Sequence, residues 1–192
     1  MKGLFTLFSR GLTSYLQKMR GGGRSSPHPL QWRNAFCSWF GGFIGIALVG
    51  LLAESNELTR HDNLFLIGSF GATAVLLYGA PAAPFSQPRY VLGGHIISAL
   101  VGVTVFKLLP EPVWLASALA VSSAIMLMYL TMTTHPPGGA TALIAVIGSE
   151  KVHQLGYWYV LEPVLEGVVL LLVIALLINN LSPHRKYPNY WF

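Results

Sequence analysis

Long stretches without any charged residue are the feature that most constrains this chain. They cover residues 34–53, 63–88, 90–106, 112–149 and 167–184. The hydrocarbon core of a membrane is about 30 Å thick, so a helix needs roughly 20 apolar residues to cross it. Only 10% of the residues are charged and 53% are hydrophobic, unlike a typical soluble domain. The sequence therefore predicts an all-α, polytopic membrane protein.

Six hydrophobic segments can be delimited, and two of them are short or broken. Since an α-helix rises 1.5 Å per residue, the fifth segment covers only about half of the hydrocarbon core. Two arrangements are possible: six crossings, or four crossings with the second and fifth segments re-entrant. Both place the same number of basic residues on the cytoplasmic side of the membrane, so the charges do not distinguish them. The segments are residues 35–53, 63–78, 88–109, 112–131, 138–148 and 159–180.

Basic residues flank the hydrophobic region at both ends. Six Lys and Arg residues precede the first segment, and Arg185 and Lys186 follow the last. This is the positive-inside pattern, and it predicts that both termini are cytoplasmic, with a bacterial inner membrane as the first expectation and an organelle membrane as the second. The predicted parts are a basic amphipathic arm and linker (1–34), a transmembrane domain (35–182) and a basic, aromatic tail (183–192). The start of the arm also fits a cleaved transit peptide.

An internal repeat links the second and fifth segments. The string Gly-Ala-Thr-Ala at residues 71–74 recurs at residues 139–142, an offset of 68. With three segments in each half, the halves would form a 3+3 inverted repeat, as in many transporters. We expect residues 68–70 and 135–138 to break their helices, so that each string begins a half-helix. Close helix packing by small residues is the alternative explanation of the strings.

Two half-helices that point their N-termini at one place would create a site for a small anion. Each N-terminus carries unpaired N–H groups and the equivalent of about half a positive charge. Hydroxyl and imidazole groups nearby would replace part of the hydration shell of the anion. The residues predicted to bind it are Ser69, Gly71, Ala72, Thr73, Gly138, Gly139, Ala140 and Thr141, together with His135, Arg89 and His95.

Several of these residues have a structural alternative. His135 either binds the anion or a proton, or it only bonds backbone carbonyls freed at the kink. Arg89 is either an interfacial anchor or an anion-attracting group at the mouth of a pathway. His95 is a structural or a functional residue. We expect Gly41, Gly45, Gly94, Ser98 and Gly102 to mediate helix contacts.

The sequence shows no signature of an enzyme. It has no serine elbow, no phosphate loop, no dinucleotide fingerprint and no His/Glu pair at metal spacing. The single cysteine, Cys37, excludes an intramolecular disulfide and a cysteine-based metal site. The net charge of +5 comes mostly from the flanking basic residues rather than from a nucleic-acid surface. We therefore expect no catalytic residue, metal, cofactor or nucleic-acid partner.

The string at residues 134–142, Thr-His-Pro-Pro-Gly-Gly-Ala-Thr-Ala, resembles the signature of the HPP family of integral membrane proteins. Residues 70–74, 79–81, 87–89 and 93–95 are similar to that family in order and spacing. The resemblance implies a permease usually described with four spans, with plastid and cyanobacterial relatives assigned to nitrite transport. We therefore expect a permease for a small monovalent anion, nitrite first, that forms a homo-oligomer in the bilayer. The alternative is a membrane scaffold or assembly protein without transport activity.

Overall fold

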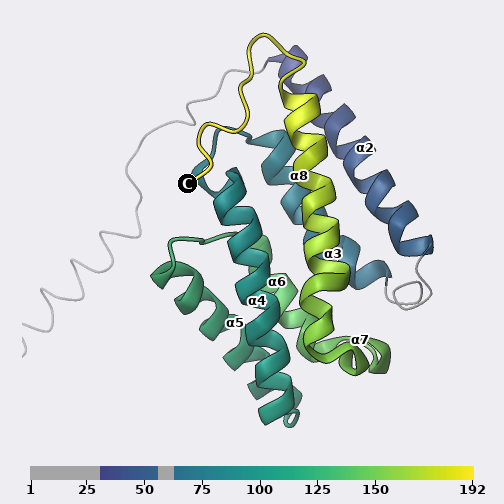
Figure 1. Ribbon diagram of the computed structural model, residues 1–192, viewed down its shortest axis with the longest axis vertical. Coiled ribbons are helices and arrows are strands. Elements are labelled where there is room, and N and C mark those ends of the chain that lie inside the picture. The colour runs from purple at the N-terminus through teal and green to yellow at the C-terminus, as the bar shows by residue number, and fades with distance from the viewer. Residues whose placement is uncertain (1–30, 56–62) are drawn as a thin grey trace, which may run out of the picture. The chain divides into compact units, whose positions relative to one another are not determined.

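The computed structural model describes residues 31–55 and 63–192, and every regular element in them is a helix. The predicted N-terminal arm lies almost wholly outside the described residues. The all-α prediction is confirmed (Figure 1). The elements are α2 (Trp32–Ser55), α3 (Asn63–Ala74), η2 (Val75–Gly79), η3 (Pro84–Ser86), α4 (Pro88–Leu108), α5 (Val113–Leu130), α6 (Pro136–Ile147), α7 (Glu150–Leu155), η4 (Gly156–Val160), η5 (Leu161–Leu165) and α8 (Glu166–Asn179).

Within the described residues, four helical stretches are long and apolar enough to cross a membrane. They are Trp32–Glu54, Pro88–Leu108, Val113–Leu130 and Glu150–Asn179. Two shorter apolar stretches accompany them. The α-helix α3 and the π-helix η2 have 12 and 5 residues and together rise about 26 Å, whereas α6 has 12 residues and rises about 18 Å. The fifth predicted segment is therefore a short helix, as its length indicated.

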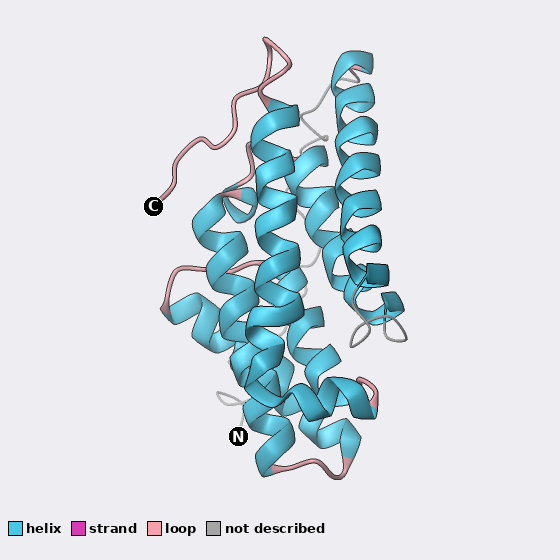
Figure 2. Cartoon of the chain, turned by 45° about the vertical axis from the view of Figure 1, so that its right-hand side comes forward, coloured by secondary structure: helices cyan, strands magenta, loops and turns pink. Residues whose placement is uncertain are grey.

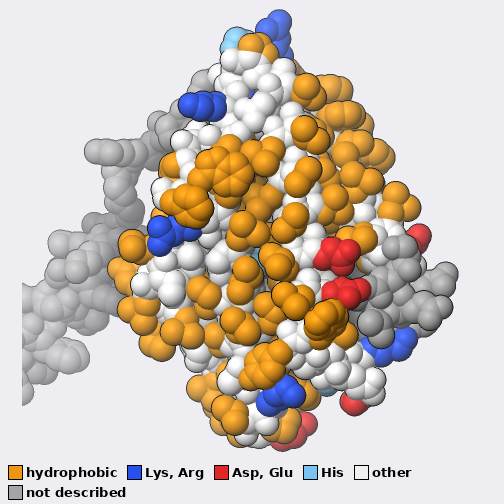
Figure 3. All heavy atoms as spheres, in the orientation of Figure 1, with side chains coloured by type: hydrophobic (Ala, Val, Ile, Leu, Met, Phe, Trp, Pro, Cys, Tyr) orange, Lys and Arg blue, Asp and Glu red, His pale blue; other side chains and the backbone are white. Residues whose placement is uncertain are grey.

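Hydrophobic side chains cover most of the face shown in Figure 3, and charged side chains are few on it. Large apolar residues stay exposed on several helices, among them Val75, Ile125 and Leu177. Such a surface would be unfavourable in water, but it is not penalised against lipid tails. The described bundle is therefore built to lie in a bilayer.

The stretch from α3 to η2 runs back along α2. The Ser38 hydroxyl, near the start of α2, donates to the Tyr78 carbonyl at the end of η2 over 2.7 Å. Asn179, the last residue of α8, donates to the Leu77 carbonyl over 3.0 Å. The start of α2, the end of η2 and the end of α8 therefore meet at one end of the bundle. Figure 2 shows that the described chain consists of helices joined by loops.

The opposite end of the bundle is formed by the end of α4 and the connection before α8. The Lys107 ammonium lies 5.7 Å from the ring centre of Tyr157 in η4. Gly156 has a φ of +55°, a conformation that glycine adopts without strain, and it ends α7 at the turn. α4 therefore spans the bundle from one end to the other.

Two glycines bring α4 close to the chain around α6. A Cβ atom at Gly102 would lie 2.5 Å from the Ala142 carbonyl oxygen, and one at Gly94 would overlap the Cβ atom of His135. On the other side of the bundle, Gly41 and Gly45 leave room for the Tyr78 ring. The prediction that these glycines mediate helix contacts is confirmed.

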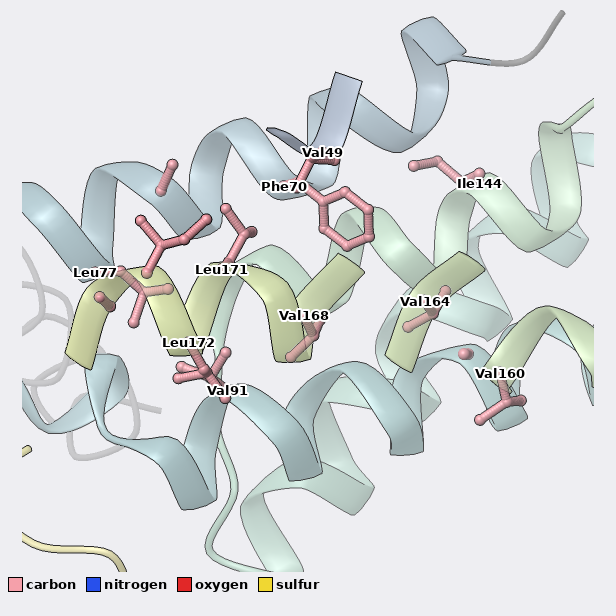
Figure 4. Close-up of a cluster of buried hydrophobic side chains, with 14 of the residues drawn as sticks. Val49, Phe70, Leu77, Val91, Ile144, Val160, Val164, Val168, Leu171 and Leu172 are labelled. Atoms are coloured by element: carbon pink, nitrogen blue, oxygen red, sulfur yellow. The ribbon is translucent and has the colours of Figure 1, made fainter. Parts of the chain in front are cut away.

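Apolar side chains fill the space between α8 and its neighbours. Figure 4 shows Val168 and Leu171 of α8 among side chains from α3, η2 and α4, including Phe70 and Leu77. A second cluster joins α5 to α6, where small alanines face the partner helix at every fourth position (Ala116, Ala120, Ala124). Several of the buried polar side chains gather in one region between α3, α4 and α6.

Prolines set the beginnings of α4, α5 and α6. Pro88 and Pro136 occupy the first turns of their helices, and Pro112 immediately precedes α5. Proline suits these positions because the first N–H groups of a helix have no partner within it. The break predicted at residues 135–138 is present at its first residue, since α6 begins at Pro136 with His135 as its N-cap residue. Residues 136–138 form the first turn of α6, so the helix starts three residues before Gly139.

The predicted break at residues 68–70 is wrong. α3 is continuous from Asn63 to Ala74, so Gly71 to Ala74 end an α-helix instead of beginning one. The physical reason is that glycine and serine weaken a helix by only about 1 kcal/mol or less, whereas the paired prolines before Gly138 remove backbone donors outright. The two strings therefore do not occupy equivalent places in their helices, and a 3+3 repeat is not established.

Arg185 ties the C-terminal segment to three helices. Its guanidinium donates to the carbonyl and the side-chain oxygen of Asn34, to Ser38 Oγ, to the Tyr78 carbonyl and to Asn179 Oδ1. The neighbouring Lys186 is exposed. Arg185 therefore stabilises the end of the bundle at which α2 begins and α8 ends.

Replacing Arg185 with glutamine should lower the free energy of unfolding in detergent by about 2 kcal/mol, because charge-assisted hydrogen bonds to several carbonyls are lost. Lys186→Gln removes the same charge without these bonds and should leave stability within about 0.5 kcal/mol. Thermal unfolding of the two variants makes the comparison. Equal stability would show that the tail does not hold the helices.

Gly102→Ala should also destabilise the bundle, by about 1 to 3 kcal/mol, because its methyl group would overlap α6. Gly42→Ala is the matched control, since nothing lies within 4 Å of the position that its Cβ atom would take. Melting temperatures measured in one detergent should fall for Gly102→Ala only. A fall of the same size for both would show that close packing against α6 is not the cause, since alanine by itself favours a helix over glycine.

Candidate functional site

Five of the predicted site residues meet inside the bundle. Ser69 and Thr73 come from α3, His95 from α4, His135 from the N-cap of α6 and Thr141 from its second turn. Each side chain is at most 3% exposed. We call these five residues the polar network. Polar groups buried in a bilayer must find partners within the protein, and these residues find them in one another.

The imidazole of His95 lies between the two repeated threonines. Its Nε2 is 2.8 Å from Thr73 Oγ1, and its Nδ1 is 2.7 Å from Thr141 Oγ1. Thr73 and Thr141 occupy the same position in the two Gly-Ala-Thr-Ala strings. The strings therefore converge on one histidine although their helices differ.

His135 continues the polar network toward η3. Its Nε2 is 3.2 Å from Thr73 Oγ1, and its Nδ1 is 2.8 Å from the Phe85 carbonyl oxygen. The ring centres of His95 and His135 are 4.9 Å apart. Because Gly94 has no side chain, His135 can lie against α4 at this depth. The two histidines thus share the Thr73 hydroxyl.

Ser69 closes the other end of the polar network. Its Oγ is 2.6 Å from Thr141 Oγ1 and 3.2 Å from the Pro137 carbonyl oxygen. Tyr159 of η4 supports this end, because its hydroxyl donates to the Thr141 carbonyl over 3.1 Å. A continuous path of hydrogen bonds therefore connects Ser69 with the Phe85 carbonyl.

The N-terminus of α6 offers fewer donors than the sequence suggested. Pro136 and Pro137 have no N–H group, and the Gly138 N–H donates to the His135 carbonyl over 2.8 Å. The prediction of two half-helix N-termini with free amides therefore needs correction. The helix dipole of α6 still acts here, but the polar donors come from imidazole and hydroxyl groups.

The small residues of the predicted site do not join the polar network. Ala72 is exposed, and a side chain at Gly71 would extend into open space. Gly139 and Ala140 are half-buried in the first turns of α6. Gly138 is buried and serves packing, since a Cβ atom there would lie 2.6 Å from Ser98 Oγ.

Arg89 lies apart from the polar network. Its guanidinium donates to the Thr131 carbonyl at the end of α5 over 3.2 Å. This bond fits the anchoring role among the two that the sequence left open. Attraction of solute at the mouth of a pathway stays a prediction.

Sequence reasoning missed three groups at the site. The Tyr159 hydroxyl and the Phe85 carbonyl bond residues of the polar network. The buried Gln87 amide donates to the Pro81 and Ala83 carbonyls and so supports the turn that carries Phe85. The sequence around a buried tyrosine that follows a glycine turn does not indicate that the tyrosine will lie at a site. In the described parts of the chain, no three or more His, Cys, Asp or Glu residues are grouped so that they could hold a metal ion.

Thr73→Val should destabilise the protein because it leaves two buried imidazole nitrogens without their shared hydroxyl. We expect a loss of about 1 to 2 kcal/mol in the free energy of unfolding, near the upper range for polar contacts in membrane proteins. Thr104→Val is the control, since its hydroxyl is exposed. Equal melting temperatures for the two variants would contradict a closed network at Thr73.

The comparisons with known proteins agree with this picture. The family model described as "HPP, transmembrane region" matches residues 27–188. A transmembrane protein of Dictyostelium discoideum is 41% identical over 181 residues, which cover 93% of this chain and 57% of that protein. A second one is 38% identical over 185 residues, covering 94% and 64%. No solved structure matches.

The chain thus spans about three fifths of the length of these relatives. The helical bundle, the apolar surface and the His-Pro-Pro-Gly-Gly string around the polar network all lie within the matched region. This chain belongs to the HPP family of integral membrane proteins.

Proposed function

We propose that this protein is a permease for a small monovalent anion, with nitrite as the leading substrate. Membership in the HPP family is consistent with a membrane transporter in general. The observation that carries the proposal is the polar network, because five buried polar side chains inside an apolar membrane bundle are costly unless they serve a function.

The chemistry of the polar network fits an anion that accepts hydrogen bonds. Imidazole N–H and hydroxyl groups donate, and each of them can exchange an internal partner for a bound oxygen atom. Nitrite is small and presents two acceptor oxygens. The break before α6 supplies a place where the backbone departs from regular helix deep in the bundle, which is typical of transporter sites.

We further propose that the basic end of the bundle faces the cytoplasm or the equivalent side of an organelle membrane, and that the protein forms a homo-oligomer. Arg33 and Lys186 accompany Arg185 at this end. Exposed aromatic side chains follow one side of α2, including Trp39 and Phe43. A bundle of this size leaves only a thin wall around a pathway, which favours assembly.

Flux measurements in proteoliposomes test the proposed function. Near neutral pH, where nitrite is ionised, vesicles with the protein should take up nitrite at least tenfold faster than vesicles without it. Competition by formate, nitrate and chloride would then order the anions by affinity. A membrane scaffold would add no anion flux, and that result would overturn the proposal.

His135→Gln should reduce the initial rate of nitrite uptake about tenfold or more, since losing one hydrogen bond to a charged group is worth roughly 1.4 kcal/mol or above. His184→Gln is the matched control because His184 is exposed in the C-terminal segment. Both variants should be compared at equal amounts of folded protein. Unchanged uptake by His135→Gln would remove His135 from the pathway.

A further inference from the structure

We propose that the anion moves together with one proton, and that the proton is carried by the imidazoles of the polar network. This inference rests on the proposed function and names its coupling ion. It starts from the hydrogen-bond partners, which define the donor and acceptor at each step when both histidines are neutral.

The backbone carbonyl of Phe85, at one end of the polar network, determines which ring nitrogen of each histidine carries a proton. The Phe85 oxygen can only accept, so His135 carries its proton on Nδ1 and accepts at Nε2. The Thr73 hydroxyl therefore donates to His135 Nε2. Because Thr73 has no second proton, His95 Nε2 must donate to Thr73 Oγ1. The tautomers of both rings are thus assigned from their partners.

The same proton order continues beyond His95. With its proton on Nε2, His95 accepts at Nδ1, and the Thr141 hydroxyl donates to it. Ser69 then donates to Thr141 Oγ1. All the protons point one way, from Ser69 toward the Phe85 carbonyl, which is the arrangement of a proton-conducting hydrogen-bonded chain.

Each hydroxyl in this chain has a second acceptor within reach. Thr73 Oγ1 is 3.2 Å from the Ser69 carbonyl oxygen, and Thr141 Oγ1 is 3.5 Å from the Pro137 carbonyl oxygen. Ser69 Oγ is 3.2 Å from the same Pro137 oxygen. The polar network can therefore change its proton order by rotation of hydroxyl groups alone.

These second acceptors allow the polar network to hold one extra proton. When His95 gains a proton on Nδ1, Thr141 turns from the ring to the Pro137 carbonyl and becomes an acceptor. When His135 gains one on Nε2, Thr73 turns to the Ser69 carbonyl. In either state, each of these side-chain donors keeps a partner, which is the condition for a charged group to persist at this depth.

An anion bound at this site requires the extra proton to balance its negative charge. The helix dipole of α6 supplies about half a positive charge, and the first three positions of α6 give no free amide. An unpaired anion in a low-dielectric interior is strongly unfavourable. A protonated imidazole supplies the missing charge, so the formal charges of the imidazolium and the anion cancel.

The other ionisable groups around the polar network do not take the place of the protonated imidazole. α3 and α6 contain no ionisable side chain. α4 adds Arg89, which bonds the Thr131 carbonyl, and Lys107 at its far end. It also adds Tyr90, whose ring lies against those of Phe85 and Tyr190. From η4, the Tyr159 hydroxyl donates to the Thr141 carbonyl, and on α5 Tyr129 is exposed.

Two acids occur in η5 and at the start of α8. Glu162 accepts a hydrogen bond from Trp158 Nε1 on an exposed surface, and Glu166 is exposed at the start of α8. On η2, the Tyr78 hydroxyl donates to the Leu171 carbonyl. His95 and His135 are therefore the groups at this site that take up the proton.

Transport in this scheme makes and breaks no covalent bond to the anion. One proton and one nitrite enter from one side, the proton resides on an imidazole while nitrite is bound, and both leave on the other side. No net charge crosses the membrane. Transport should consequently respond to a pH gradient and not to a membrane potential.

Proteoliposomes loaded with a pH-sensitive dye test this directly, with the potential clamped by potassium and valinomycin. In the wild type, a gradient of one pH unit should accumulate nitrite about tenfold on the alkaline side. An imposed potential should leave the initial rate unchanged, and proton and nitrite entry should match one to one after subtraction of protein-free vesicles.

His95→Gln tests the assignment, because an amide can still bond both threonines but cannot take up a proton. Its nitrite flux should lose the one-to-one proton movement and either become potential-dependent or fall at least tenfold. His184→Gln should keep wild-type coupling. If His95→Gln is not monodisperse in detergent, His135→Gln takes its place and should show the same loss.

The outcomes separate the two proposals. No nitrite flux in the wild type would overturn the proposed permease and the coupling with it. Nitrite flux driven by potential without proton movement would leave the permease standing and overturn the coupling. Full coupling in His95→Gln would show that His95 does not carry the proton.

Discussion

The interaction on which this structure depends is the bonding of one buried histidine by two threonines from separate helices. His95 holds Thr73 of α3 with one ring nitrogen and Thr141 of α6 with the other. In a bilayer no water is available to satisfy these groups, so the three helices must keep their relative positions. The fold and the candidate site therefore both require that α3, α4 and α6 keep these relative positions.

Glycine and proline make that bonding possible. Gly94 lets His135 approach α4, and Gly102 lets α6 lie against the same helix further along. The prolines at the start of α6 fix the beginning of this helix next to His135. They also have no N–H groups, so no backbone amide there competes with the side chains of the polar network for hydrogen-bond acceptors. Because the helices pack closely and few backbone N–H groups are free there, the side chains must donate the hydrogen bonds to any bound solute.

Much of this could be predicted from residue patterns. Uncharged runs indicated the spans, Pro136 and Pro137 indicated the start of α6, and the repeated threonines pointed to the residues that meet. The break at Gly68 was wrong because a glycine and a serine in a packed helix cost too little to interrupt it. Tyr159 and the Phe85 carbonyl were missed, since tertiary packing alone brings them to the site.

Nitrogen NMR of histidine-labelled protein in lipid most directly tests whether the polar network is ordered as its partners require. Without substrate, His95 should be neutral with its proton on Nε2, and His135 neutral with its proton on Nδ1. Both N–H groups should exchange slowly with water. Two freely exchanging tautomers on either ring, or rings that titrate like exposed histidines, would contradict a closed proton-ordered network.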